Sequence, residues 1–213
     1  MKKRNFCIAL LLLAAFVLWT VGICVVDVQK IGPEGSAVGF ATVNGYFHAL
    51  TGVNMQLYTL TDWLGLVPVG FSLGFALLGL AQWLGRKSIL KVDRSILLLG
   101  GFYIVTAAAY LFFESYVINY RPVLIEGFLE ASYPSSTTLL VLCVMPTSIM
   151  QLRRRIKNRT FCKAVTIAIT AFIVFMVAGR LVSGVHWLTD IIGGILLSAS
   201  LVTMYDSIMG ENL

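Results

Sequence analysis

The chain has 213 residues, of which 58% are hydrophobic and only 12% are charged, and its formal net charge is +6. A soluble domain of this length usually carries about twice that charged fraction, so a chain this apolar has too few polar residues to cover a surface that faces water. Composition therefore excludes a soluble enzyme, a disordered tail and a fibrous repeat. It predicts a polytopic membrane protein that forms one domain over residues 1–213.

Six apolar segments are long enough to cross a bilayer as helices, which takes about 20 residues each. Their lengths favour helices over the short, alternating strands of a membrane barrel. The first segment follows a basic N-terminus, as a signal peptide does, but it is long and has no small-x-small cleavage site, so we expect a retained helix. The expected fold class is all-α, with six transmembrane helices at Phe6–Val26, Trp63–Gly85, Ser95–Phe113, Ser135–Leu152, Ala164–Gly179 and Trp187–Tyr205.

The basic residues are distributed unevenly between the two ends of these segments. If the N-terminus is cytoplasmic, 13 of the 16 Lys and Arg residues fall on the cytoplasmic side, and only Lys30, Arg121 and Arg180 fall on the other. This asymmetry is typical of the positive-inside rule and predicts cytoplasmic N- and C-termini in the cell membrane. Topology explains the basic runs better than nucleic-acid binding does, so no nucleic-acid partner is expected. The sequence does not indicate an oligomeric state.

The longest connection lies on the outer side, between the first and second segments. Within it, Gly39–Leu60 is mildly apolar and includes His48. We expect this stretch to form an interfacial helix that lies under or beside the bundle.

Three polar clusters fall at the outer ends of the predicted helices. Ionisable groups at membrane depth are costly, so they are candidates for function. The clusters are Arg121-Pro122 after the third helix, Pro134-Ser135-Ser136-Thr137-Thr138 at the start of the fourth, and the run from Arg180 through His186 to Asp190 between the fifth and sixth. Because helix directions alternate, the sequence predicts that all three meet at one face of the membrane.

The first two clusters, together with Arg180 from the third, suggest a phosphate site. Two arginines that reach one place can hold a phosphate through planar, bidentate hydrogen bonds. Pro134 suits a first helical turn, and the free backbone N–H groups near Ser135 and Ser136 would form an anion-binding helix terminus. The candidate phosphate ligands are therefore Arg121, Arg180, Ser135 and Ser136.

The third cluster suggests a nucleophile. His186 and Asp190 are four residues apart, so on a helix they share a face, and the carboxylate can orient the imidazole ring for attack. Each feature also has an ordinary explanation, because an arginine can extend to the interface, a Ser/Thr run can cap a helix, and a His/Asp pair can be a simple helix contact. Their coincidence at one face favours a site.

These residues resemble the signature of the type 2 phosphatidic acid phosphatase family, six-helix membrane enzymes related to vanadium haloperoxidases. That signature is Lys-x6-Arg-Pro, then Pro-Ser-Gly-His, then Ser-Arg-x5-His-x3-Asp. The chain has the third part as Gly179-Arg180-x5-His186-x3-Asp190, and it retains Arg121-Pro122 of the first and Pro134-Ser135 of the second. The motif residues fall within 114–190, and the resemblance runs from about Ser95 to the C-terminus.

The resemblance implies hydrolysis of a lipid phosphate or diphosphate through a phosphohistidine intermediate, without a metal or other cofactor. It implies that His186 attacks phosphorus and that Asp190 orients the ring. The equatorial oxygens would be held as charge develops by Arg121, Arg180 and the amides near Ser135 and Ser136. The substrate would enter from the outer leaflet with its tail in the bilayer.

Two positions depart from the family signature. Glu114 replaces the lysine of the first part, and Thr137 replaces the histidine of the second, which the family uses as general acid. One consequence is a preference for diphosphates, since a leaving phosphate has a second pKa of about 6 and needs little protonation. Alternatively, Glu114 or His48 supplies the proton. A third possibility is a protein that binds a lipid phosphate without hydrolysing it, alone or as a partner subunit.

Overall fold

The computed structural model describes residues 2–210, and within this range the structure is helical, with isolated bridges in the loops but no strand. The all-α class is therefore confirmed. Two 3-10 turns, η1 (Pro33–Gly35) and η2 (Ile89–Lys91), lie in connections. The α-helices are α1 (Lys2–Val25), α2 (Ala41–Thr51), α3 (Met55–Leu64), α4 (Leu66–Arg86), α5 (Arg94–Ser115), α6 (Ser136–Arg155), α7 (Arg159–Val182) and α8 (Leu188–Met209).

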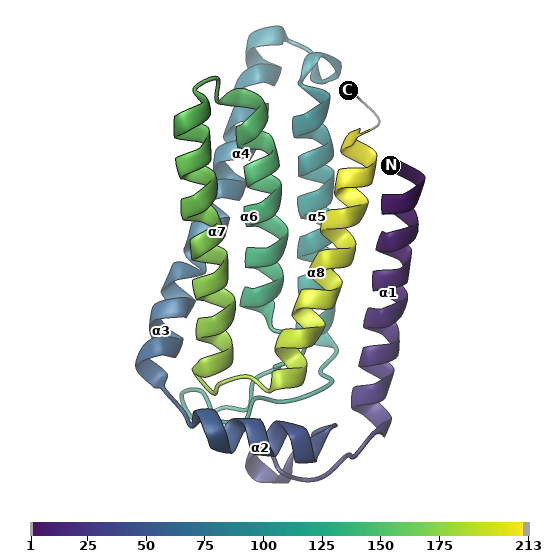
Figure 1. The fold of residues 1–213 in the computed structure, drawn as a ribbon, viewed down its shortest axis with the longest axis vertical. Helices are drawn as coiled ribbons and strands as arrows, with labels where there is room; N and C mark the ends of the chain where they lie inside the picture. The colour runs from purple at the N-terminus through teal and green to yellow at the C-terminus, as the bar shows by residue number, and fades with distance from the viewer. Residues whose placement is uncertain (1, 211–213) are drawn as a thin grey trace.

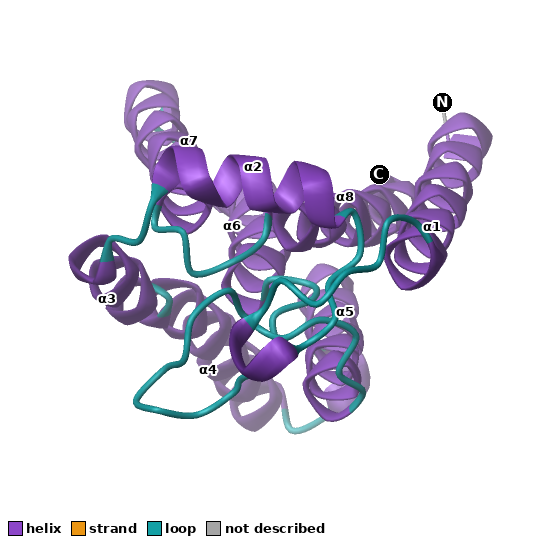
Figure 2. Cartoon of the chain, turned by 90° about the horizontal axis from the view of Figure 1, so that it is seen from below, coloured by secondary structure: helices purple, strands orange, loops and turns teal. Residues whose placement is uncertain are grey.

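The long helices α1, α4, α5, α6, α7 and α8 run side by side in alternating directions (Figure 1). The start of α1 and the end of α8 lie at the same end of this bundle. Helix α2 lies across the opposite end, as the view from below shows (Figure 2). The connections α5–α6 and α7–α8 reach that same end, so the predicted polar clusters are brought to one end of the molecule.

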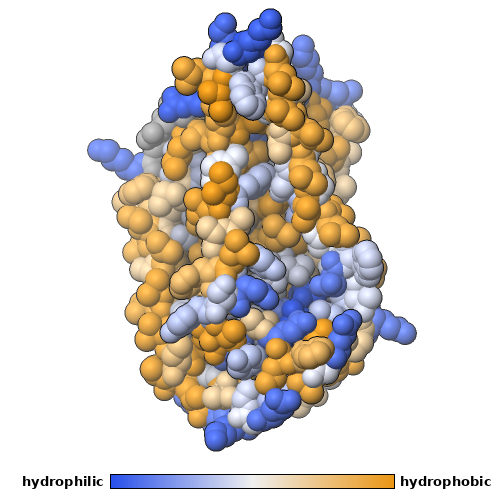
Figure 3. Space-filling model, turned by 180° about the vertical axis from the view of Figure 1, so that it is seen from behind, coloured by the Kyte–Doolittle hydropathy of each residue, from blue (hydrophilic) through white to orange (hydrophobic). Residues whose placement is uncertain are grey.

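The face of the bundle seen in Figure 3 is apolar along most of its length, and hydrophilic groups concentrate toward its ends. Among residues 2–210, five helical segments are long and apolar enough to cross a membrane: Lys3–Val25, Met55–Arg86, Arg94–Ser115, Arg159–Val182 and Leu188–Met209. The sixth predicted span, Ser135–Leu152, corresponds to α6, which does not reach this level of hydropathy. Helix α6 ends in three arginines and is packed against α4, α5, α7 and α8. A helix enclosed by other helices can carry hydroxyl and amide side chains that lipid would exclude.

The predicted interfacial helix over Gly39–Leu60 is wrong as a single element, because the chain breaks at Gly52. Gly52 has a φ of +60°, and Asn54 then caps α3 by accepting a hydrogen bond of 2.9 Å from the Leu57 N–H. The backbone N–H of Asn54 donates to the Ser183 carbonyl at 2.9 Å. The junction of α2 and α3 is therefore fixed to the connection between α7 and α8.

Close backbone approaches set the position of that connection. Gly184 has a φ of +67°, and a Cβ placed on it would lie 1.7 Å from the Gly52 carbonyl oxygen. On α8, a Cβ on Gly193 would lie 2.3 Å from the Tyr133 ring. Glycine is required at these contacts because any side chain would collide with its neighbour. The start of α8 consequently lies directly against the loop that precedes α6.

Candidate functional site

The loop over residues 116–135 is held in a folded-back shape by hydrogen bonds between its two arms. The Arg121 N–H donates to the Glu130 carbonyl at 3.0 Å, and the Ser132 N–H donates to the Asn119 carbonyl at 2.9 Å. The Trp187 indole N–H joins this loop to the α7–α8 connection by donating to the Tyr120 carbonyl at 2.8 Å. Backbone geometry thus carries Arg121 and Ser132 to the same place as the third polar cluster.

Arg180 and His186 are in direct contact in the interior of this end. Arg180 Nη2 lies 3.0 Å from His186 Nε2, and the two residues are 1% and 3% exposed. A guanidinium group can only donate hydrogen bonds, so Nε2 is the acceptor and carries a lone pair. The ring proton therefore resides on Nδ1.

Ser132 lies between His186 and Asp190. Its Oγ is 3.0 Å from His186 Nδ1 and donates to Asp190 Oδ2 at 2.5 Å. The predicted direct contact of Asp190 with the ring is replaced by this bridge, because Nδ1 and Oδ2 are 4.0 Å apart. With the proton on Nδ1, the chain of donors runs from His186 to Ser132 to Asp190. The nucleophilic lone pair of the ring is then on Nε2, the atom that accepts from Arg180.

The Asp190 carboxylate is held from several other directions. Its Oδ2 accepts the backbone N–H of Trp187 at 2.9 Å, and its Oδ1 accepts Asn119 Nδ2 at 3.4 Å. Asp190 is completely buried and occupies the first turn of α8, where the helix dipole favours a negative charge. These contacts fix the carboxylate as the anchor of the Ser132 bridge.

The electrostatics of the site favour a neutral imidazole. Burial lowers the pKa of His186 well below its ordinary value, and the positive charges of Arg180 and Arg121 lower it further. The neutral ring is the form that acts as a nucleophile.

Tyr58 and Asp62, which the sequence analysis did not select, complete the surroundings of the arginines. The Tyr58 ring lies close to both guanidinium groups, with its centroid 4.8 Å from Arg180 Cζ and 5.5 Å from Arg121 Cζ. Asp62 Oδ1 lies 3.5 Å from Arg180 Nη1. Both residues come from α3, where their spacing of four places them on one face. Two features of the sequence could have identified them as site residues: their spacing of four, and the position of Asp62 as an acid at the edge of an apolar segment.

Arg121 has its own partners. Its Nη2 lies 3.2 Å from Glu130 Oε2, and its Nη1 donates to the Tyr58 hydroxyl at 3.2 Å. Arg180 differs, because its buried Nε has no hydrogen-bond partner among the described residues. A buried guanidinium N–H without an acceptor is costly to leave unpaired, and it is available to an anionic ligand.

Ser135 and Ser136, at the start of α6, differ in their surroundings, because Ser135 precedes the helix and Ser136 is its first residue. Pro134 precedes the helix and does not occupy its first turn, because α6 begins at Ser136 with Ser135 as N-cap. The Ser135 N–H donates to the Asp190 carbonyl at 3.1 Å, and its Oγ accepts a hydrogen bond from Thr138 at 3.0 Å. The Ser135 amide is thus occupied in this conformation.

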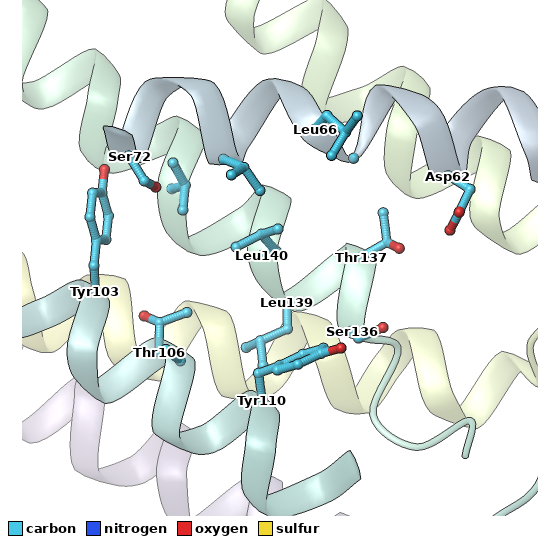
Figure 4. A pocket seen from close by; sticks show the side chains of 14 residues that line it. Asp62, Leu66, Ser72, Tyr103, Thr106, Tyr110, Ser136, Thr137, Leu139 and Leu140 are labelled. Atoms are coloured by element: carbon cyan, nitrogen blue, oxygen red, sulfur yellow. The ribbon is translucent and has the colours of Figure 1, made fainter. Parts of the chain in front are cut away.

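A cavity of about 570 Å³ lies between α4, α5 and α6. Its lining includes Asp62, the ion-pair partner of Arg180, but neither arginine and not His186. One part is polar, with Asp62, Ser136 and Thr137, and the remainder is mainly apolar. Figure 4 shows Thr137 and Asp62 at one end of the cavity and Ser72 and Tyr103 at the other. A mixed lining of this kind suits an amphiphilic ligand.

The two remaining candidates lie apart from the buried centre. Glu114 is exposed at the end of α5 and makes no ion pair with an arginine in the part of the chain that the structure describes. His48 lies on α2 with its ring 5.5 Å from the Trp187 ring, and burial lowers its pKa. No group of three or more His, Cys, Asp or Glu side chains among residues 2–210 is arranged to hold a metal ion.

Comparison with known proteins places this geometry in context. The sequence profile of the PAP2 superfamily matches residues 73–212. Among solved structures, the chain is similar to a transmembrane PAP2 type phosphatidylglycerolphosphate phosphatase from Bacillus subtilis. The identity is 18%, the TM-score is 0.60, and the match covers 96% of this chain and 97% of the other. At this identity the likeness concerns the fold. A search of curated proteins found no match.

Proposed function

Because the chain belongs to the PAP2 superfamily, we propose that it is a membrane phosphatase that hydrolyses a phosphate ester or diphosphate bond of a lipid, with His186 as nucleophile. The observation that carries this proposal is the buried contact of 3.0 Å between Arg180 Nη2 and His186 Nε2. A phosphoryl group offers paired acceptors to arginines and an electrophilic phosphorus to the ring, and Arg121 supplies the second cation beside Tyr58.

The proposed reaction has two displacement steps. A phosphoryl group first replaces His186 Nε2 as the acceptor for Arg180, which frees the lone pair. Nε2 then attacks phosphorus, the N–P bond forms, and the bond to the leaving oxygen breaks with its electron pair going to that oxygen. Ser132 and Asp190 stabilise the positive charge that develops on the ring. Water then attacks phosphorus, and the N–P bond breaks with its electron pair returning to Nε2. The protons of the water leave with the released phosphate or pass to solvent, so the imidazole is neutral again with its proton on Nδ1.

Arg121, Arg180 and the start of α6 are the proposed holders of the phosphoryl oxygens. The unpartnered Nε of Arg180 supports this role. Ser136 and Thr137 lie in the first turn of α6 and line the cavity next to Asp62, where unpaired helix N–H groups favour an anion. Ser135 is proposed to act by positioning Asp190 through its amide.

We propose that the substrate is a lipid whose leaving group needs no strong acid, such as a lipid diphosphate. Thr137 cannot donate a proton as an imidazolium does. Within residues 2–210, neither Glu114 nor His48 forms a hydrogen bond or ion pair with Arg121, Arg180 or His186. A departing phosphate is stable as an anion near neutral pH because its second pKa is about 6. The apolar part of the 570 Å³ cavity supports an acyl or prenyl tail.

The proposed topology has six spans, with α6 as the sixth, in one domain over residues 1–213. Its support is the alternating direction of the long helices (Figure 1) and the excess of basic residues at the end opposite to the site. By the positive-inside rule both termini are then cytoplasmic, and the site opens to the outer leaflet of the cell membrane.

The decisive experiment is to trap the phosphoenzyme. Purified protein is incubated with a lipid diphosphate that carries ³²P in its terminal phosphate and is then quenched rapidly. We expect an acid-labile label on protein and a steady release of phosphate. The chain has two histidines, so His186→Ala should abolish the label, whereas His48→Ala should retain it.

The same experiment distinguishes the alternative, a phosphate-lipid binding protein or partner subunit on this fold. The replacements Glu114 and Thr137, together with the ion pairs that Asp62 and Glu130 make with the arginines, are the observations that favour it. Binding of vanadate or a lipid phosphate without label and without released phosphate, over a range of lipid phosphates and diphosphates, would establish that alternative.

A further inference from the structure

We propose that the end of the bundle opposite to the candidate site binds an anionic phospholipid. Its phosphate would lie in a basic pocket between α6 and α7, and an acyl chain would lie in a groove that continues along α7. The α6–α7 connection is at the end away from α2 (Figure 1). The basic pocket has a volume of about 590 Å³ and is lined by Arg153, Ile156, Lys157, Arg159, Cys162, Lys163, Thr166 and Ile167.

The cations of this pocket are not neutralised by the protein. Arg153, Lys157, Arg159 and Lys163 are exposed, and no ion pair is formed by any of them within residues 2–210. By contrast, Arg155, on the side of α6 away from the pocket, is paired with Asp93 at 3.8 Å. The lining includes no acid. Four positive charges that converge on one hollow favour an anionic group there.

The backbone adds to the positive potential. The pocket lies at the first turn of α7, whose N-cap, Asn158, accepts a hydrogen bond of 3.0 Å from the Phe161 N–H. The positive end of the α7 dipole therefore lies beside a pocket that already has four cations. A phosphate group can interact with both at once.

The pocket continues into an apolar groove, which distinguishes a lipid from a soluble anion. A second hollow of about 570 Å³ shares Thr166 and Ile167 with the basic pocket and extends along α7 over Thr170, Ala171, Val174 and Phe175. The hydroxyls of Thr166 and Thr170 donate to their own helix, at 2.9 and 2.8 Å, so they present methyl groups outward. The groove lies on a predicted span.

This continuity determines the occupant. In a phospholipid the phosphate lies at the bilayer surface and the acyl chain extends toward the bilayer centre. The basic pocket and the apolar groove follow one another along α7 in the same order. Basic pockets between transmembrane helices bind anionic lipid headgroups through the same chemistry. The proposed topology assigns this lipid to the cytoplasmic leaflet. The inference does not depend on hydrolysis at His186.

The test is a lipid titration of the purified, full-length protein in a neutral detergent, read by native mass spectrometry. We expect phosphatidylglycerol to bind at least ~10-fold more tightly than phosphatidylcholine. The variant Lys157→Gln/Arg159→Gln/Lys163→Gln should lose at least ~10-fold in affinity for phosphatidylglycerol. The matched variant Lys87→Gln/Lys91→Gln/Arg94→Gln removes the same charge from the α4–α5 connection and should bind as the wild type does.

A further variant and a soluble probe distinguish a bound lipid from a bound free anion. Ala171→Trp fills the groove and should weaken the binding of phosphatidylglycerol. The binding of glycerol phosphate, the soluble probe, should be unaffected. Equal losses in both glutamine variants, equal binding of the two lipids, or unchanged lipid binding by Ala171→Trp would each overturn the proposal. Lipid that binds at the candidate site adds the same amount to the measured binding of both glutamine variants. The difference between the two variants therefore reports on the basic pocket alone. Labelling of His186 is measured separately, so either proposal can fail alone.

Discussion

The Ser132 hydroxyl donates a hydrogen bond of 2.5 Å to Asp190, 58 residues further along the chain. The same oxygen lies 3.0 Å from His186 Nδ1, so the serine transmits the orientation of a buried carboxylate to the imidazole. The nucleophile is thus positioned by a three-residue chain of hydrogen bonds, and the middle member is a neutral hydroxyl. Its removal leaves both end groups in place and breaks their connection.

Ser132→Ala should lower kcat by about 10- to 100-fold, the equivalent of one hydrogen bond to a charged group. KM should change little, because Ser132 does not contact the arginines. Initial rates with a lipid diphosphate check this. Ser148→Ala removes another buried serine hydroxyl, one that donates to the Val144 carbonyl within α6, and should retain activity. An unchanged kcat in Ser132→Ala would show that Asp190 acts without the bridge.

The acid limb of kcat/KM should lie below pH 6.5, the ordinary His range. Burial and the charges of Arg180 and Arg121 lower the pKa of His186, so the ring stays neutral to a lower pH. Arg121→Gln removes one charge and should move this limb upward while the rate falls. A pH–rate profile of both proteins is the measurement, and a wild-type limb above pH 6.5 would contradict the prediction.

The same lowered pKa has a consequence for stability. Between the pKa of His186 in the folded protein and about 6.5, the unfolded chain binds a proton that the folded chain does not. The stabilising contribution of the neutral ring is therefore present above this window and is lost as pH falls through it. Thermal unfolding of wild type and His186→Ala should show a smaller acid-induced decrease for the variant.

Asp62→Asn should strengthen the binding of phosphate or vanadate by up to about 5-fold, since a partly exposed ion pair contributes less than about 1 kcal/mol. Asp62 lies 3.5 Å from Arg180 Nη1 and competes with an anionic ligand. Glu126→Gln removes an acid from the loop at the same end and serves as control. Isothermal titration measures both. Weaker binding by Asp62→Asn would mean that Asp62 orders Arg180 for the ligand.

Restoring the two departures from the family signature tests the leaving-group argument. Thr137→His should raise turnover of an alkyl phosphate, because general acid catalysis contributes about 10²–10⁴-fold. Glu114→Lys replaces an acid by a cation at the end of α5, so its effect on the same turnover should be smaller. Turnover of a lipid diphosphate should change little. The check is a parallel substrate profile of wild type and both variants. A wild-type preference for phosphatidate over diphosphates would refute the argument.

Gly184→Ala should lower the thermal unfolding temperature and the activity together. Its Cβ would lie 1.7 Å from the Gly52 carbonyl oxygen, and its φ of +67° disfavours a side chain. The two effects cost about 2 kcal/mol or more. Gly70→Ala, where nothing lies within 4 Å, is the matched control. Equal unfolding temperatures for the two variants would show that the α7–α8 connection adapts.

The sequence alone determined the helical class, the positions of the long helices and the meeting of three polar clusters at one end. These depend on local quantities, namely the length of apolar runs, the distribution of basic residues and the alternation of helix direction. Arg121, Arg180, His186 and Asp190 were found because each stands out as an ionisable residue beside an apolar segment.

Only the tertiary structure decided how those residues touch. Three contacts join segments that are far apart in the chain: the bridge through Ser132, the approach of Tyr58 to both guanidinium groups, and the ion pair of Asp62. The break between α2 and α3 depends on the close approach of Gly184 to Gly52. Contacts of this kind are set by hydrogen bonds in irregular loops and by side-chain volume, and neither leaves a periodic pattern in the sequence.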